Sequence, residues 1–357
     1  SIKMPKNSII NKKKKPKKPK KPKLDRIEKN TENWNLTKIP NLNPTCWMDS
    51  VNGSDVHLTQ SQVMERFTCD YSNLIAIGND RVYRGFDSLK NQTVAVKVIQ
   101  VQNSLQKQNC VKAECDMKSL KEHVNIVKIL GYCPGYEGNF FIFLELCDGK
   151  EIFEEILKNN ADSKINTEYE ALKTFQQILE GINYLHTNQI SHGDIKLENM
   201  MFHGDTVKII DFGYSRRNCV QKSPYGSIYY LSPEMISNMY LAKEHSHIQS
   251  YMDINGIKSD MWSLGIALFA MLLKIFPFIW TYKTYLNFKK SNQPFSEIFK
   301  DWLPKISDLS KKILDMLIKI NPDERCTTMF LLNYLKQELE INKNKLSLVN
   351  LSEVSIM

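Results

Sequence analysis

The order of the predicted secondary structure is the feature that most constrains the fold of this chain. From about residue 67 onward, short apolar stretches typical of strands come first, and longer stretches with helical periodicity follow. A small sheet-rich lobe followed by a larger helical lobe fits this order. We therefore expect an α+β fold with strands at 74–77, 82–86, 93–101 and 140–146 and helices at 110–122, 169–186, 262–273 and 308–320.

The first 30 residues differ from the rest of the chain in charge. They contain 13 Lys and Arg against two acids, a local charge of +11, whereas the whole chain carries +9 and the remainder therefore −2. Lysine repulsion and proline keep such a segment extended and solvated, so we expect a basic disordered tail at 1–30. This tail is either a plain extension or a patch for an acidic partner, a nuclear-import receptor or an anionic surface.

The rest of the chain divides into an N-terminal extension at 31–66, a main domain at 67–338 and a C-terminal tail at 339–357. Eight cysteines without a CxxC pair favour reduced thiols over a zinc site or a disulfide framework. The N-terminus lacks an apolar signal region, and the longest apolar run, at 264–273, is too short to span a membrane. We expect a cytoplasmic or nuclear protein without a transmembrane segment.

Two acids and an amide follow one another at a spacing suited to phosphoryl transfer. The segment 190–201 reads I-S-H-G-D-I-K-L-E-N-M-M and contains Asp194 and Asn199, and Asp211 opens the sequence D-F-G twelve residues after Asn199. A carboxylate and an amide oxygen can hold Mg²⁺ against phosphates. A second carboxylate can accept the proton of the attacking hydroxyl. These residues predict transfer of a phosphoryl group with Mg²⁺.

Together with V-A-V-K at 94–97, these motifs resemble those of the eukaryotic protein kinases. The resemblance covers about residues 70–338, with S-P-E at 232–234, D-M-W-S-L-G at 260–265 and N-P-D-E-R at 321–325 as further marks. It implies a bilobal kinase-like fold, with an antiparallel sheet and one main helix in the N-lobe and a larger helical C-lobe. It also implies roles for six residues: Asp194 as catalytic base, Lys196 on the transferred phosphate, Asn199 and Asp211 on Mg²⁺, and Lys97, paired with Glu114, on the ATP phosphates.

The same resemblance predicts where adenine would bind. A flat base is held by burial and dispersion between apolar walls, here Val82 and Ala95 above and Met201 below. Leu144 matches the position at the back of this slot, although Leu144 and Met201 taken alone are more typical of an ordinary core. The remaining expected contacts are hinge backbone groups of Glu145 and Cys147, the ribose partner Glu151, and Ile75 and Ile77 in the loop over the phosphates.

The glycine-rich loop of the family is eroded in this chain. Counted back from Val82, its three glycine positions fall on Ile75, Ile77 and Asp80, and the loop keeps only Gly78. Glycine lets backbone amides approach a phosphate closely, and an acid at position 80 repels the phosphate. We therefore expect weaker binding of ATP, with the chemistry itself still available.

Two further departures from the family pattern concern the activation loop, which follows Asp211, and the region after it. Gly193 replaces the arginine that in most family members pairs with a phosphate on the activation loop. We therefore expect that phosphorylation of this loop, for which Ser223 is the candidate, is not obligatory. Residues 235–259 form an insertion, and His245 and His247 within it fit a solvated loop better than a metal site.

The motifs favour a Ser/Thr kinase that uses Mg²⁺ and ATP on a protein substrate. Lys196, and Ser227 in G-S-x-x-Y, are typical of Ser/Thr rather than tyrosine kinases. Glu151 and Glu198 fall at positions that, in members resembling the calcium/calmodulin-dependent group, also meet arginines of the substrate, which is a weak pointer to that group. The abundance of Asn, Lys and Ile resembles proteins of A/T-rich genomes such as those of apicomplexan parasites. A catalytically weak pseudokinase scaffold is the alternative, and a nucleic-acid-binding protein is disfavoured because no recognition fold accompanies the tail.

Overall fold

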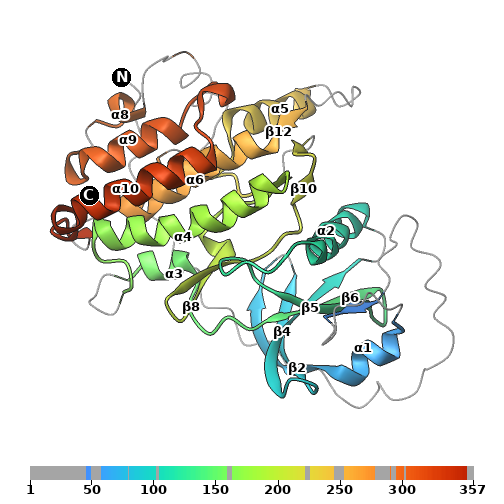
Figure 1. The fold of residues 1–357 in the computed structure, drawn as a ribbon. Helices are drawn as coiled ribbons and strands as arrows, with labels where there is room; N and C mark the ends of the chain where they lie inside the picture. Colours follow the sequence, from blue (N-terminus) through green and yellow to red (C-terminus); the bar gives the residue numbers. More distant parts are fainter. Residues whose placement is uncertain are drawn as a thin grey trace.

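The computed structural model describes residues 46–49, 58–78, 80–101, 104–158, 163–221, 226–244, 253–277, 290, 295–300 and 303–351. In these residues the chain forms one lobe built on a sheet and one lobe of helices, which meet along one side (Figure 1). The two-lobed α+β architecture expected from the sequence is confirmed.

The smaller lobe contains a six-stranded antiparallel sheet within the described residues, in the strand order β1-β5-β6-β4-β3-β2. Consecutive apolar side chains of β4, β5 and β6 are buried, so both faces of these strands are covered, and Phe67 stacks on Phe143 with ring centroids 4.5 Å apart. The strands are β1 (Trp47–Met48), β2 (Phe67–Ile77), β3 (Arg81–Asp87), β4 (Gln92–Gln100), β5 (Ile129–Pro134) and β6 (Asn139–Glu145), with α1 (Gln60–Arg66) before β2.

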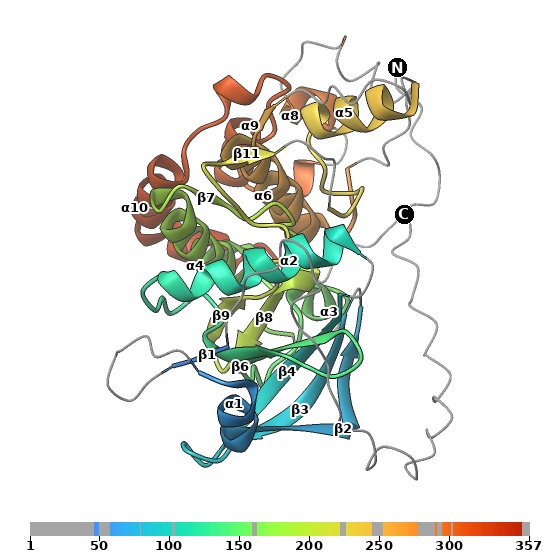
Figure 2. The same ribbon diagram turned by 90° about the vertical axis from the view of Figure 1, so that its right-hand side faces the viewer.

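The main helix of this lobe, α2 (Leu105–Asp116), starts and ends earlier than the predicted helix at 110–122. The side chain of Ser104 accepts a hydrogen bond from the backbone N–H of Lys107, so Ser104 caps the helix, a signal that the prediction missed. After Asp116 the chain tightens into η2 (Met117–Ser119). Figure 2 shows α2 between the sheet and the helical lobe.

The larger lobe is organised around α4 (Glu168–Thr187) and α6 (Gly256–Leu273). A capping box between Thr167 and Glu170 starts α4. Asn255 caps α6, which begins at Gly256, six residues before the predicted start at 262. The remaining helices are α3 (Ile152–Ile156), α5 (Pro233–Glu244), α8 (Phe295–Ile298), α9 (Asp308–Leu317), which ends before the predicted residue 320, and α10 (Thr328–Ser347), with η3 (Leu197–Asn199), η4 (Leu303–Lys305) and η5 (Pro322–Glu324).

Three short strand pairs belong to the larger lobe within the described residues. They are β7 (Ile190–Ser191) with β10 (Arg216–Arg217), β8 (Met200–His203) with β9 (Thr206–Ile209), and β11 (Val220–Gln221) with β12 (Ile254–Asn255). The loops between these strands carry the predicted chemical motifs. The pairs therefore hold the loops against the lobe.

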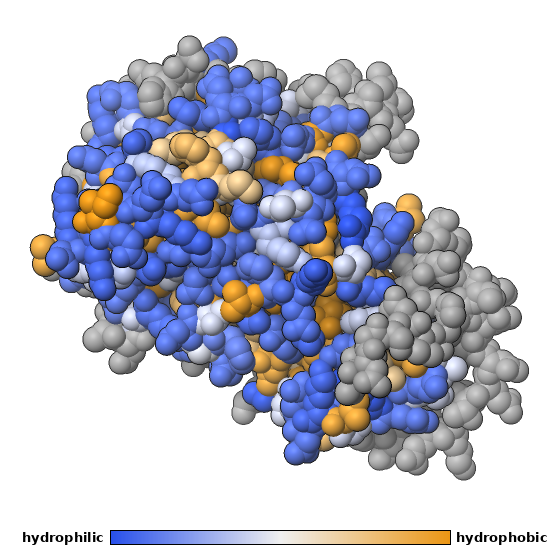
Figure 3. Space-filling model, in the orientation of Figure 1, coloured by the Kyte–Doolittle hydropathy of each residue, from blue (hydrophilic) through white to orange (hydrophobic). Residues whose placement is uncertain are grey.

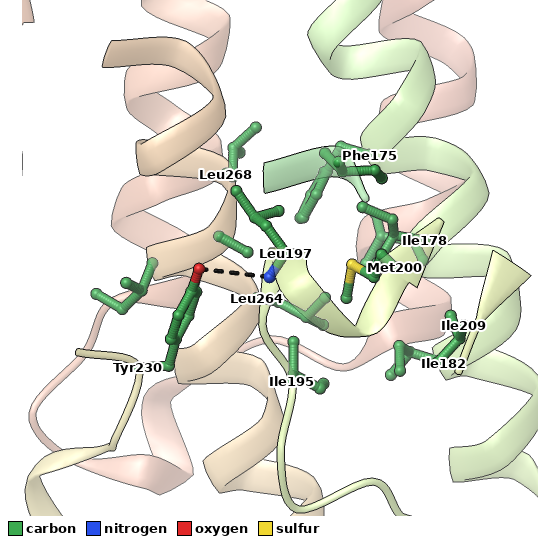
Figure 4. Packing of buried hydrophobic residues seen from close by; sticks show 14 of the residues in the cluster. Phe175, Ile178, Ile182, Ile195, Leu197, Met200, Ile209, Tyr230, Leu264 and Leu268 are labelled. Atoms are coloured by element: carbon green, nitrogen blue, oxygen red, sulfur yellow. Dashed lines mark hydrogen bonds between the residues drawn. The ribbon is translucent and has the colours of Figure 1, made fainter. Parts of the chain in front are cut away.

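The core of the larger lobe lies directly beneath these loops. Leu197 and Met200 point toward Phe175, Ile178 and other apolar side chains of α4 and α6 (Figure 4). In the described part of the chain, α6 alone has the length and composition of a membrane span, and 83% of that stretch is buried inside the protein, as in a core helix. The apolar side chains of the loops pack against α6, and this packing fixes the position of the loops.

Segments outside the expected domain boundaries pack on both lobes. β1 adds an edge strand to β5, and Trp47 stacks on Tyr132 with ring centroids 5.8 Å apart. At the other end, α10 runs through residue 338, and the backbone N–H of Leu351 donates to the carbonyl of Asn166 at 2.7 Å. Parts of the expected extension at 31–66 and of the expected tail at 339–357 thus belong to the folded body.

Candidate active site

The loop that carries Asp194 is held by a buried acid of α6. The carboxylate of Asp260 accepts hydrogen bonds from the backbone N–H groups of His192 at 2.7 Å and Gly193 at 3.0 Å. Gly193 has φ of 79°, a conformation that a side chain disfavours, so the glycine suits this turn. The loop is therefore positioned by the core helix rather than by its own sequence alone.

The carboxylate of Asp194 is surrounded by three donors. Lys196 Nζ lies 2.6 Å from Oδ2, and Asn199 Nδ2 lies 3.0 Å from the same oxygen. The backbone N–H of Ser227 donates to Oδ1 at 3.2 Å. Asp194 is 5% exposed, and the packing of its neighbours leaves it one orientation. This arrangement brings the expected base, Asp194, into contact with Lys196, the expected contact of the transferred phosphate, and with Ser227, which is typical of Ser/Thr kinases.

A second group of charges lies where the sheet, α2 and the D-F-G sequence meet. Lys97 Nζ on β4 lies 2.5 Å from Glu114 Oε1 on α2 and 2.8 Å from Asp211 Oδ1. Asp211 has φ of 67°, and the next residue, Phe212, is buried against the ring of His192. The structure thus places the expected lysine, its glutamate partner and one expected Mg²⁺ ligand in contact.

Burial and mutual attraction set the protonation states of this group. Burial alone would lower the pKa of Lys97, but the charges of Asp211, Glu114 and Asp80 raise it well above its ordinary value. Burial raises the pKa of Glu114 to about 7, because the opposing effect of Lys97 is smaller. Burial would also raise the pKa of Asp211, but Lys97 outweighs it and holds the pKa below its ordinary value. Asp211 is therefore the acid that stays ionised.

The residues that could hold Mg²⁺ have the kind of donor atoms that this ion prefers. Asn199 uses its Nδ2 to donate to Asp194, so its Oδ1 is the atom that a cation can bind. The Asp211 side chain is 30% exposed and ionised, so an oxygen of this carboxylate is also accessible. One carboxylate and one amide oxygen make a hard donor set, which matches the preference of Mg²⁺.

The eroded loop between β2 and β3 turns its acid inward. Asp80 Oδ1 lies 2.5 Å from Lys107 Nζ on α2, and Asp80 Oδ2 lies 3.7 Å from Lys97 Nζ. The expected contacts Ile75 and Ile77 lie on β2 and are 41% and 63% exposed. Lys107 was not anticipated from the sequence, and the missed helix cap at Ser104 was the signal that would have placed it.

The expected adenine slot has its walls on adjoining strands. Val82 pairs with Lys97, and Ala95 pairs with Leu144, so the register places Ala95 and Leu144 side by side on neighbouring strands. Met201 of β8 forms a bridge with Glu151, the expected ribose partner. Figure 3 shows apolar side chains gathered in the crease between the lobes, on a face that is otherwise largely hydrophilic.

Of the expected hinge residues, Glu145 is the last residue of β6 and Cys147 lies two residues beyond it. The Glu145 side chain accepts from the backbone N–H of Lys128 at 2.7 Å and from Lys208 Nζ at 2.8 Å. The backbone N–H of Glu145 donates to the carbonyl of Lys128 at 3.0 Å. Burial raises the pKa of the Cys147 thiol to about 12, so this thiol stays neutral near pH 7.

The segment after Asp211 is held by backbone pairing. β10 pairs with β7, and β11 pairs with β12 at the end of the insertion. Arg325 closes the far end, with Nη1 2.6 Å and Nη2 2.7 Å from the two carboxylate oxygens of Glu234. The expectation that phosphorylation of this loop is not obligatory stays a prediction. Ser223, His245 and His247 lie outside the described residues.

The family model of the Protein kinase domain matches residues 77–335 of this chain. The chain belongs to the protein kinase family. It is 27% identical over 278 residues to Serine/threonine-protein kinase H1 of Homo sapiens, which covers 74% of this chain and 60% of that protein. It is 29% identical over 227 residues to Probable serine/threonine-protein kinase fhkD of Dictyostelium discoideum, covering 61% and 29%.

Calcium-dependent protein kinase 5 of Plasmodium falciparum is 27% identical over 260 residues, which cover 68% of this chain and 40% of that protein. The chain thus spans about 60% or less of the length of these relatives.

Proposed function

We propose that this kinase transfers the γ-phosphate of ATP to Ser or Thr hydroxyls of a protein substrate. The observation that carries the proposal is the contact of Lys97 with both Glu114 and Asp211, beside an Asp194 held by Lys196 and Asn199. Two clusters from distant parts of the chain are thus complete and face one crease. The names of the relatives support the Ser/Thr class.

Each residue has a step that its geometry suits. Among the described residues Asp194 Oδ1 accepts one backbone hydrogen bond, from Ser227 at 3.2 Å, whereas Oδ2 accepts from Lys196 and Asn199, so Oδ1 is the oxygen better placed to accept the proton of a substrate hydroxyl. Lys196, beside the same carboxylate, is placed to contact the phosphoryl group in transfer. Lys97 is placed to bind the α- and β-phosphates.

Mg²⁺ belongs to this proposal as the cofactor of ATP, with Asn199 and Asp211 as its protein ligands. When bound, it supplies positive charge that offsets the charge of the phosphates. Glu198 and Glu151 are proposed to meet basic residues of the substrate. Glu198 Oε2 accepts from the hydroxyl of Tyr230 at 3.1 Å, which holds this acid beside the loop of Asp194.

The Lys-rich tail at 1–30 is proposed to bind an acidic partner, a nuclear-import receptor or an anionic surface, and so to set a cytoplasmic or nuclear location. Its charge of +11 beside a body of −2 supports this proposal. Because the body is nearly neutral, the tail would act as a tether and the catalytic domain would not be attracted to the same surface.

The test is transfer of labelled phosphate from Mg-ATP to a library of Ser-, Thr- and Tyr-centred peptides. Asp194→Asn is expected to lower the rate by a factor of about 10²–10⁴ without unfolding the chain. Asp205→Asn is the matched control, because the side chain of Asp205 is fully exposed. If the wild type labels Ser and Thr peptides no faster than Asp194→Asn does, the chain is the non-catalytic scaffold considered from the sequence.

A further inference from the structure

The acid in the eroded loop lies between two lysines from different elements. Asp80 Oδ1 is 2.5 Å from Lys107 Nζ, and Asp80 Oδ2 is 3.7 Å from Lys97 Nζ. The Asp80 side chain is 11% exposed, so these contacts are shielded from water. A carboxylate is therefore held at an anion-binding position beside the lysine that the proposed function assigns to the ATP phosphates.

The charges around this position do not favour a further anion. Lys97 and Lys107 bring two positive charges, while Asp80, Glu114 and Asp211 can bring three negative ones. An incoming phosphate has to compete with Asp80 for Lys97, and like charges in a shielded site repel strongly. The competition is weaker if another cation holds Asp80.

Lys107 is placed to be that cation. It lies in the first turn of α2, where the Ser104 cap fixes the start of the helix, and its contact with Asp80 is closer than that of Lys97. Lys107 and Glu114 are seven residues apart on one helix, so they lie on the same face two turns apart. The helix that positions Lys97 through Glu114 thus also holds the loop through Lys107.

We propose that Lys107 is a positioning residue for ATP: it neutralises Asp80 and draws it toward α2, so that Lys97 is free to bind phosphate. The inference rests on the proposed function, because it concerns the same nucleotide site. The ion pair of Asp80 with Lys107 offsets the negative charge that this loop carries where the family has a glycine. An acid in the loop is tolerated because α2 supplies a lysine beside it.

The experiment is a double-mutant cycle on the full chain with Lys107→Met, Asp80→Asn and both together. The dissociation constant of Mg-ADP by calorimetry, and KM and kcat for ATP, are measured for each. Lys107→Met is expected to weaken nucleotide binding and raise KM about tenfold with kcat little changed, because Asp80 is then left to Lys97 alone. Asp80→Asn is expected to lower KM about fivefold.

The decisive variant is the double mutant, which is expected to match Asp80→Asn, because Lys107 has no acid left to neutralise. Lys112→Met is the control, since Lys112 is exposed on the same helix. A tenfold loss on Lys107→Met that persists in the Asp80→Asn background would overturn the inference, because Lys107 would then act on the phosphate or on the helix directly. If the wild type binds no Mg-ADP, the proposed function itself fails, a result that the cycle distinguishes.

Discussion

We expect the buried acid Glu114 to make the activity of this kinase dependent on pH near neutrality. Its pKa is raised to about 7, because burial outweighs the attraction of Lys97. About a tenth of the molecules therefore carry an ionised Glu114 at pH 6, and about nine tenths at pH 8. The ionised form is the one that holds Lys97 as an ion pair. We expect kcat/KM to rise severalfold, up to about tenfold, from pH 6 to pH 8.

Glu114→Gln removes this dependence, because the amide is neutral throughout this range and still accepts a hydrogen bond from Lys97. The variant should show a low and flat profile, close to the wild-type rate at pH 6. The assay is kcat/KM for a peptide substrate between pH 5.5 and 9, with saturating Mg²⁺. Dividing the wild-type profile by the variant profile cancels groups common to both, such as ATP and the histidines.

Stability should change in the opposite direction. The folded pKa of Glu114 lies above its ordinary value of 4.5, so its contribution to stability is complete below pH 4.5 and is lost as the pH rises through about 7. Relative to Glu114→Gln, the wild type should lose about 3 kcal/mol of unfolding free energy between pH 4.5 and pH 8. Urea unfolding at several pH values measures this difference.

Glu122→Gln serves as the control, since that side chain is 74% exposed on the surface of the same lobe. Its profiles should follow the wild type in both assays. An inflection near pH 7 that persists in Glu114→Gln would refute the reasoning, because another group would then be titrating. A constant difference in stability across the pH range would refute it equally, because Glu114 would then keep its ordinary pKa.

Three further predictions follow from other parts of the chain. Asp211→Asn should lower phosphate transfer by orders of magnitude through loss of a Mg²⁺ ligand, and an activity near half of wild type would contradict that role. Arg325→Met should cost about 3–5 kcal/mol in urea unfolding, since it leaves Glu234 without its partner, and a cost below about 1 kcal/mol would count against it. Deleting residues 1–30 should leave kcat on a short peptide unchanged while reducing salt-dependent binding to anionic vesicles or acidic proteins; a large loss of turnover at both low and physiological salt would show that the tail contacts the catalytic domain.

Much of the fold could be predicted because its elements carry local signals. Strand β4 was expected at 93–101 and lies at Gln92–Gln100, and α4 was expected at 169–186 and lies at Glu168–Thr187. Apolar periodicity marks both elements from end to end. The starts of α2 and α6 were misplaced because the caps at Ser104 and Asn255 precede any apolar pattern.

The candidate site likewise has contacts that the sequence predicts and contacts that it does not. The residues expected to act together, such as Asp194, Lys196 and Asn199, lie within one short loop, so their proximity follows from the sequence. The contact of Lys97 with Asp211 joins residues 114 positions apart, and the resemblance to the kinases was needed to expect it. Spacing alone does not determine which distant loops meet.

What the sequence by itself determined is which chemical groups are present and in which order: the lysine, the two acids and the amide of a kinase, the eroded glycine loop and the basic tail. What only the tertiary structure decided is the direction of Asp80. From the sequence this acid is a repulsive charge above the phosphates; in the folded chain it lies 2.5 Å from Lys107, a residue 27 positions away. The physical reason is that the energy of a charge depends on its distance to other charges and on its exposure to water, and folding sets both.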